Sequence, residues 1–250
     1  MMISGNRIVT LTIFIIGLTT LLTGRMAAAE PLVYSQLTEG YWQLWQMNDD
    51  GSETRQLTFS KSDKREAVCF SGGNTILYRT NNGQLKMMKI QEESQQEILA
   101  KYNRISNPDY CAAREEVVFV RYDPKGMDIS DIWRADLNEQ RPQILTRDHR
   151  LKYQPAYNQD CSQIAFVQAD PEERKAHQIW LMDSEGQNQK AVTTDKALAS
   201  GPQFLPGGQG LVFASNRNGG DYNIYRVGMS GQNMSALTTA EGLDTSPAVS

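Results

Sequence analysis

A unit that starts again at its own end constrains this chain more than any other feature. Residues 201–250 contain four short runs rich in Val, Ile, Phe and Tyr, and the pattern restarts at Ser246-Pro247. Turn-forming segments rich in Gly, Pro and Asn separate the runs. β-branched and aromatic residues between such turns are typical of strands. One unit followed by a restart predicts a repeat.

The same unit recurs along the rest of the chain. A spacing of about 40–47 residues is the period of a four-stranded propeller blade. The sequence therefore predicts an all-β, five-bladed β-propeller of four-stranded antiparallel blades, without long helices. The third run of each copy falls at 44–47, 85–88, 132–135, 179–182 and 224–227, and the fourth at 56–58, 98–100, 144–146, 191–193 and 236–238.

The first copy is one strand short. Residues 30–58 supply runs at 32–34, 41–47 and 54–58 but no first run, whereas residues 245–250 supply a first run and nothing after it. An open ring would leave two sheet edges free to aggregate. We therefore expect the C-terminal strand, Pro247-Ala248-Val249, to pair with the N-terminal three strands and close the ring.

Three segments resemble a known repeat. Residues 45–58 (WQMNDDGSETRQLT), 180–193 (WLMDSEGQNQKAVT) and 202–219 are similar to the repeat of the TolB β-propeller family. The resemblance covers nearly all of the chain after residue 30, and the same repeat also builds propellers attached to serine peptidases. It implies a periplasmic propeller whose central funnel docks protein or peptide partners, among them a peptidoglycan-associated one. TolB itself has an N-terminal α/β domain and a sixth blade that this chain does not accommodate, so we expect a TolB-like protein.

The N-terminal segment is typical of a secretory signal peptide. Residues 1–29 combine Arg7, an apolar core at 8–22 and the small residues Ala27-Ala28-Ala29. This order predicts cleavage before Glu30, a single propeller domain over residues 30–250, and a periplasmic protein with no membrane span after cleavage. An uncleaved anchor is the alternative, although the run is short and Thr-rich for a span.

Charge and motifs argue against several functions. The chain carries 25 Lys plus Arg against 29 Asp plus Glu, a net charge of −4, which disfavours nucleic acid as a partner. It contains no G-x-S-x-G, H-E-x-x-H, paired C-x-x-C or strand-linked G-x-G-x-x-G motif. With only His149 and His177 available, a catalytic triad or a histidine metal site is hard to build. We therefore expect no enzyme activity, no cofactor and no metal.

Cysteines and tryptophans suggest structural roles. Cys69 aligns with aromatic residues of other copies and is predicted to be a buried core residue. Cys111 and Cys161 fall near equivalent turns of neighbouring blades, and either a disulfide or free thiols is open. The core tryptophans are expected at equivalent third-run positions, Trp45, Trp133 and Trp180, while Trp42 lies outside that register.

The candidate binding surface is the polar rim of the funnel. The linkers and first-run starts place the following residues there: Lys64, Arg65, Arg104, Asn107, Asp109, Arg150, Lys152 and Asp244. A rigid concave surface with convergent polar groups is where a loop or peptide could dock. We expect a monomeric, non-enzymatic module that binds a periplasmic protein or peptide, with an envelope lipoprotein as one candidate and a role in cell-envelope organisation.

Two alternatives to funnel docking are open. The charged loop at residues 169–176 could bind the partner instead. The chain could also be a carbohydrate-acting enzyme such as a propeller glycoside hydrolase, in which Glu66, Asp109 and Asp244 would supply the carboxylates.

Overall fold

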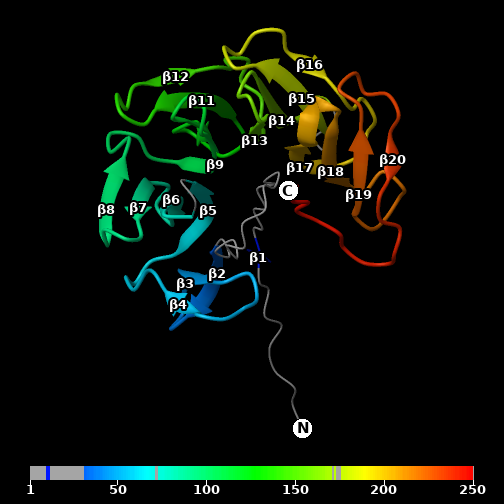
Figure 1. The fold of residues 1–250 in the computed structure, drawn as a ribbon. Coiled ribbons are helices and arrows are strands. Elements are labelled where there is room, and N and C mark those ends of the chain that lie inside the picture. Colours follow the sequence, from blue (N-terminus) through cyan, green and yellow to red (C-terminus); the bar gives the residue numbers. More distant parts are fainter. Residues whose placement is uncertain (1–9, 12–30, 71–72, 171, 173–175, 250) are drawn as a thin grey trace, which may run out of the picture.

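Five antiparallel sheets are arranged around a common axis (Figure 1). The structure is a computed structural model that describes residues 10–11, 31–70, 73–170, 172 and 176–249. Each sheet has four strands in chain order, and we name the sheets blade A (β1–β4), blade B (β5–β8), blade C (β9–β12), blade D (β13–β16) and blade E (β17–β20). The all-β, five-bladed propeller predicted from the repeat is confirmed.

Three of the strands in each blade follow the predicted runs. The first strands are β5 (Lys64–Phe70), β9 (Ile105–Cys111), β13 (Lys152–Tyr157) and β17 (Ala199–Phe204), and blade A instead begins with β1 (Thr10–Leu11). The second strands are β2 (Leu32–Thr38), β6 (Thr75–Thr80), β10 (Glu116–Tyr122), β14 (Gln163–Ala169) and β18 (Leu211–Ser215). The third strands are β3 (Tyr41–Met47), β7 (Leu85–Lys89), β11 (Ser130–Asp136), β15 (His177–Asp183) and β19 (Asn223–Val227).

The fourth strands are short for a chemical reason. They are β4 (Arg55–Gln56), β8 (Ser94–Ile98), β12 (Pro142–Ile144), β16 (Lys190–Ala191) and β20 (Ser235–Ala236). In every blade except B, a threonine hydroxyl accepts a hydrogen bond from a third-strand N–H, where the next main-chain pair would form. The threonine and its donor are Thr58 and Leu44, Thr146 and Ile132, Thr193 and Ile179, and Thr238 and Ile224, at 2.9–3.0 Å. Blade B has Ala100 at this position and the longest of these strands.

Helical structure is almost absent from the described residues. The only helical element there is one 3₁₀ turn, Pro206–Gly208. No helix in this part of the chain is long and apolar enough to cross a membrane. The predicted signal peptide lies outside the described residues apart from Thr10 and Leu11.

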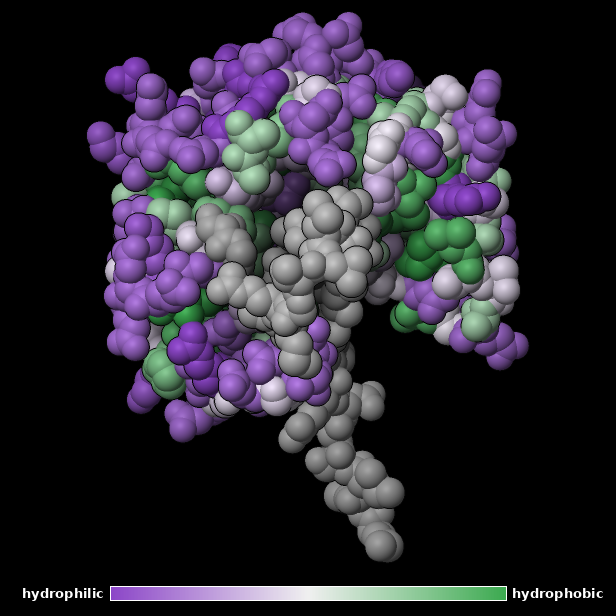
Figure 2. All heavy atoms as spheres, in the orientation of Figure 1, coloured by the Kyte–Doolittle hydropathy of each residue, from purple (hydrophilic) through white to green (hydrophobic). Residues whose placement is uncertain are grey.

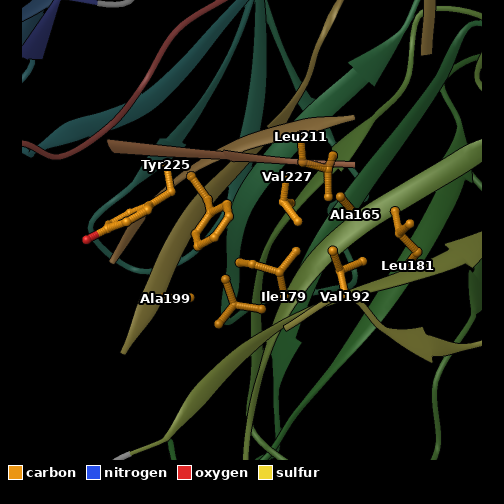
Figure 3. Packing of buried hydrophobic residues seen from close by; sticks show 10 residues of the cluster. Ala165, Ile179, Leu181, Val192, Ala199, Leu211, Tyr225 and Val227 are labelled. Carbon is orange, nitrogen blue, oxygen red and sulfur yellow. The ribbon is translucent and has the colours of Figure 1, made fainter. Parts of the chain in front are cut away.

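The core lies between successive blades. Four apolar clusters join blades A and B, B and C, C and D, and D and E. Figure 3 shows the cluster between blades D and E, in which Ile179, Leu181 and Val192 face Leu211, Tyr225 and Val227. Removing such side chains from water stabilises each by about 1.5–3 kcal/mol, so each blade is stabilised chiefly by its neighbours.

A disulfide adds to the contact between blades C and D. Cys111 ends β9, Cys161 lies in the turn after β13, and both are buried with Cα atoms 5.9 Å apart. The sequence left this pairing open, and the structure shows it formed. Cys69 remains free and half-buried, and burial raises the pKa of its thiol to about 12.

A repeated β-bulge shapes the axial strands. Glu66, Asn107, Gln154, Gly201 and Ser246 occupy equivalent positions, and all have φ between +46° and +60°. The first four stand at a break in the pairing of the first and second strands of their blades. The bulges turn the Glu66, Asn107 and Gln154 side chains toward the following blade, where each accepts a backbone N–H.

The predicted ring closure is wrong. In the described part of the chain β1, and not residues 247–249, pairs with β2, through Thr10 with Ser35 and Leu11 with Tyr34. Consecutive blades pack through β2 and β5, β5 and β9, β9 and β13, and β13 and β17. Among the described residues, no comparable contact joins blade E to blade A, and an open sector separates them (Figure 1).

The C-terminal segment explains why closure fails. Ser246 repeats the bulge conformation of the axial strands, and a Cβ on Gly201 would lie 3.5 Å from Cδ of Pro247. Residues 246–249 therefore follow blade E on its axial side, across the open sector from β2. Pairing requires strands about 4.8 Å apart, which this placement does not allow.

Candidate binding surface at the linker end

One end of the propeller carries both the linkers between blades and the loops between second and third strands. Antiparallel strands alternate in direction, so both types of connection join the same ends. We call this end the linker end. The sequence predicted the linker end as the recognition surface, with eight residues lining it.

Lys64 and Lys152 are buried, contrary to the expectation that they face the funnel. Their side chains begin β5 and β13, and the residues are 3% and 0% exposed. Nζ of Lys64 donates to the carbonyls of Ser60 and Ser62 at 2.7 and 2.5 Å, and burial lowers its pKa. Nζ of Lys152 pairs with Asp148. Each ammonium thus holds a linker in place from beneath.

Arg65 and Arg150 are accessible at the linker end. The Arg65 side chain is 46% exposed, pairs with Asp63 at 3.2 Å, and lies over the ring of Trp42 at 5.1 Å. Asp63 also accepts a hydrogen bond from the Trp42 N–H, which is the main cause of its lowered pKa. Arg150 is partly exposed beside Asp148, at 3.7 Å. These two arginines are the predicted cations that a partner could reach.

Arg104 and Asp244 also lie in linkers. The Arg104 guanidinium donates to the carbonyl of Gly126 at 2.8 Å and so ties the linker to the β10–β11 loop. The Asp244 N–H donates to the carbonyl of Tyr222 at 2.8 Å and so joins the segment after β20 to the β18–β19 loop.

Asn107 belongs to a ladder of contacts within the axial strands. The Asn107 N–H donates to Glu66 at 2.6 Å, Oδ1 of Asn107 accepts from the Gln154 N–H at 3.4 Å, and Oε1 of Gln154 accepts from the Gly201 N–H at 2.7 Å. Glu66 is further held by Arg79, at 3.0 and 3.1 Å. We call these four positions, Glu66, Asn107, Gln154 and Gly201, the axial ladder.

Asp109 lies toward the opposite end of β9. Its carboxylate accepts the Tyr157 N–H at 2.8 Å, across the boundary between blades C and D. Loss of solvent raises its pKa to about 6, against the opposing effect of hydrogen bonds from the Tyr157 and Tyr110 backbone. The structure therefore does not bring Asp109 together with the linker-end residues.

Exposed hydrophobic side chains at the linker end are a feature that the sequence analysis missed. Leu37 in the β2–β3 hairpin, Phe59 and Leu243 in linkers, and Met127 in the β10–β11 loop are all large and exposed, Phe59 by 75%. A signal was available in the sequence, because Phe59 follows the Thr58 that ends a repeat.

A fifth exposed side chain, Leu237, has a different environment. Its counterparts Leu57, Leu145 and Val192 pack in the cores between blades. Leu237 is 52% exposed because no blade follows it across the open sector. Figure 2 shows hydrophobic residues of the right-hand blade beside this sector.

The other predicted sites are located as follows. Among the described residues, no group of three or more His, Cys, Asp or Glu side chains is arranged to hold a metal ion. Half of the charged loop at 169–176 lies outside the described residues. His177 lies beside Tyr153, with Nδ1 2.6 Å from the phenol oxygen.

Comparisons with solved structures agree on the fold. TolB from Acinetobacter baumannii aligns with a TM-score of 0.71 at 13% identity, over 86% of this chain and 54% of that one. Oligogalacturonate lyase in complex with manganese aligns with a TM-score of 0.65 at 16% identity, over 84% of this chain and 62% of the lyase chain. A chain of the nidogen/laminin complex aligns with a TM-score of 0.64 at 10% identity, over 84% of this chain and 75% of that one. This chain thus spans only about 62% of the lyase. No curated protein matches it.

Four-stranded blades around an axis, with loops and linkers gathered at one end, define a β-propeller repeat protein. The sequence model of the TolB β-propeller domain matches residues 110–250. Because this match covers more than half of the chain, the chain belongs to the TolB β-propeller domain family.

Proposed function

We propose that this chain is a non-enzymatic module that binds a protein or peptide partner at its linker end. The observation that carries the proposal is the set of exposed Leu37, Phe59 and Met127 side chains at this end of the ring. Exposed apolar groups among polar ones are typical of protein-binding surfaces, and loops on a rigid scaffold commonly carry recognition.

Charge and aromatic residues complete this surface. Arg65, whose guanidinium lies over the Trp42 ring, and Arg150 add cationic groups at the same end of the ring. Arginine and aromatic residues are enriched where partners contribute most binding energy. TolB and a chain of the nidogen/laminin complex have similar propeller folds.

The setting of this function is part of the proposal. The signal-peptide pattern of residues 1–29 places the mature chain in the periplasm, where it would act as a monomer. Family membership makes an envelope lipoprotein a candidate partner and cell-envelope organisation a candidate role.

The test is partner capture by matched variants. A protein captured from envelope extract by the mature chain is identified and purified, and its association rate is measured. Arg65→Ala with Arg150→Ala should slow association about 10-fold at low salt, with a smaller effect at high salt, because charge steering is screened. Phe59→Ser should mainly raise the dissociation rate.

Arg141→Ala with Lys190→Ala, which removes two exposed cations from the opposite end of the ring, is the control and should bind like wild type. Equal binding by wild type and by the folded Arg65/Arg150 and Phe59 variants would exclude these side chains as contacts and direct the search to the 169–176 loop of the same end.

The enzyme alternative has one observation in its favour. A carboxyl with a pKa of about 6, such as Asp109, has the acidity of a general acid. The same carboxylate accepts a backbone hydrogen bond between blades, which gives it a structural role as well. Hydrolysis of aryl glycosides by the purified chain, abolished by Asp109→Asn in a folded variant, would overturn the non-enzymatic proposal.

A further inference from the structure

An open, polar hollow lies at the linker end of blade E. Its volume is ≈ 330 Å³, and its walls come from the β18–β19 loop and from the linker after β20. Asp221, Asn223 and Glu241 line the hollow and carry side-chain carboxylate or amide oxygens. No Lys, Arg or His lines the hollow.

Asn223 lines this hollow and has an acceptor that receives no hydrogen bond from the described residues. The residue is 8% exposed, and its Oδ1 is buried without a hydrogen-bond donor. The residues at the same repeat position in blades A and C are satisfied: Gln43 Oε1 and Asp131 Oδ1 accept from the hydroxyls of Thr58 and Thr146 at 2.8 and 2.9 Å. A buried acceptor without a donor destabilises the fold unless something binds it.

The two acids of the hollow also lack a cation. Asp221 accepts only the Gly242 N–H, at 3.1 Å, and no ion pair involves Glu241 within the described residues. Arg217, the nearest base along the β18–β19 loop, is engaged with Asp195 of the preceding linker at 3.1 Å.

Other blades supply an internal cation at the corresponding place. Lys64 and Lys152, the residues that follow the linkers of blades A and C, insert their ammonium groups beneath those linkers and contact linker oxygens. Burial raises the pKa of Asp131, and the nearby Lys152 ammonium opposes this rise. The residue that follows the linker of blade E at the same repeat position is Asp244. Blade E therefore keeps the oxygen acceptors of this site and replaces its cation with an acid.

We propose that the blade E hollow binds a divalent cation of the calcium type, with oxygen ligands from Asp221, Asn223 and Glu241. The cation replaces the lysine ammonium of blades A and C. Ca²⁺ accepts carboxylate and amide oxygens together with several waters in irregular geometry, which suits an open site on two loops. Mg²⁺ requires a near-ideal octahedron and gives up water reluctantly, so it should bind more weakly. With only three protein side chains, we expect a Kd of about 10⁻⁴–10⁻³ M.

The first experiment is a Ca²⁺ titration of the full chain followed by thermal unfolding. At a Ca²⁺ concentration roughly 100-fold above Kd, the Tm should rise by about 5–10 °C. Asp221→Asn with Glu241→Gln should abolish most of this rise. Asp49→Asn with Glu53→Gln removes two exposed acids from the β3–β4 turn and should leave it unchanged.

A second variant tests the comparison between blades. Asp244→Lys supplies an ammonium at the position of Lys64 and Lys152, and it should raise the Tm without Ca²⁺ and remove the response to Ca²⁺. The proposal is overturned if the wild-type Tm does not respond to Ca²⁺. It is also overturned if NaCl of equal ionic strength gives the same rise, or if the Asp221/Glu241 variant responds like wild type.

Discussion

Asp109 is a buried acid that connects two blades. Its carboxylate accepts the Tyr157 N–H, and loss of solvent raises its pKa to about 6, from 3.8 for the free side chain. A raised acid pKa means that folding favours the protonated form. The stabilising contribution of Asp109 is therefore fully present below about pH 4 and is lost as the pH rises through 6.

The raised pKa of Asp109 predicts how Asp109→Asn changes the pH dependence of stability. Asparagine keeps an acceptor for the Tyr157 N–H and carries no charge at any pH. The free energy of unfolding of wild type, minus that of the variant, should fall by about 3 kcal/mol between pH 4 and pH 7.5, as measured by urea unfolding. Asp49→Asn, at an exposed turn, is the control. Parallel pH profiles for wild type and Asp109→Asn would show that Asp109 is not desolvated in solution.

The axial strands are joined by side chains that accept backbone N–H groups from the next blade. Each ladder residue has a positive φ, and from Asn107 onward a proline follows it in the sequence. Gly201 accepts no such bond because it has no side chain, so the ladder that starts at Glu66 ends there. The axial ladder therefore depends on one side chain per blade.

Gln154→Ala tests this element. The substitution leaves the Gly201 N–H, which now receives a 2.7 Å bond, without its acceptor between two blades. We expect a loss of about 1–3 kcal/mol in the free energy of unfolding, since a half-buried donor is left unpaired. Gln187→Ala, an exposed turn residue, should change stability by less than about 0.5 kcal/mol. Equal effects of the two substitutions would show that the ladder contributes nothing measurable.

As a whole, the molecule is an arc of five blades with different numbers of neighbours. Blades B, C and D pack on both sides, whereas blades A and E each pack on one. The disulfide joins blades C and D and closes a loop with a sequence separation of 50. Stability in such repeats is approximately a sum over neighbour interfaces, so it should be unevenly distributed.

Hydrogen exchange should reveal this distribution. Amides of β14 in blade D should exchange at least about 10-fold more slowly than those of β18 in blade E, although both strands are largely buried. Replacing Cys111 and Cys161 by Ser should lower stability by up to about 4 kcal/mol and reduce protection mainly in blades C and D. Uniform exchange across all blades would indicate a single cooperative unit and contradict the nearest-neighbour description.

The sequence by itself determined the blade. Turn residues, alternating apolar runs and the recurring threonine act within one hairpin, where periodicity and chain connectivity leave few choices. The strand positions follow from that local pattern. Trp45, Trp133 and Trp180 are partly buried on the third strands, and Cys69, predicted to be a buried core residue, is only half-buried. Family resemblance in 45–58 and 180–193 pointed to the same fold.

Tertiary structure decided the remaining features. Whether 247–249 reach β2 depends on the angle between packed sheets, summed over the whole arc, and no local pattern encodes that sum. Lys64 and Lys152 look like exposed cations in the sequence, yet linker oxygens make their burial possible. Asn223 resembles any strand residue until its neighbours are known to offer no donor. In each case the deciding interaction joins segments that meet only after the blades have packed.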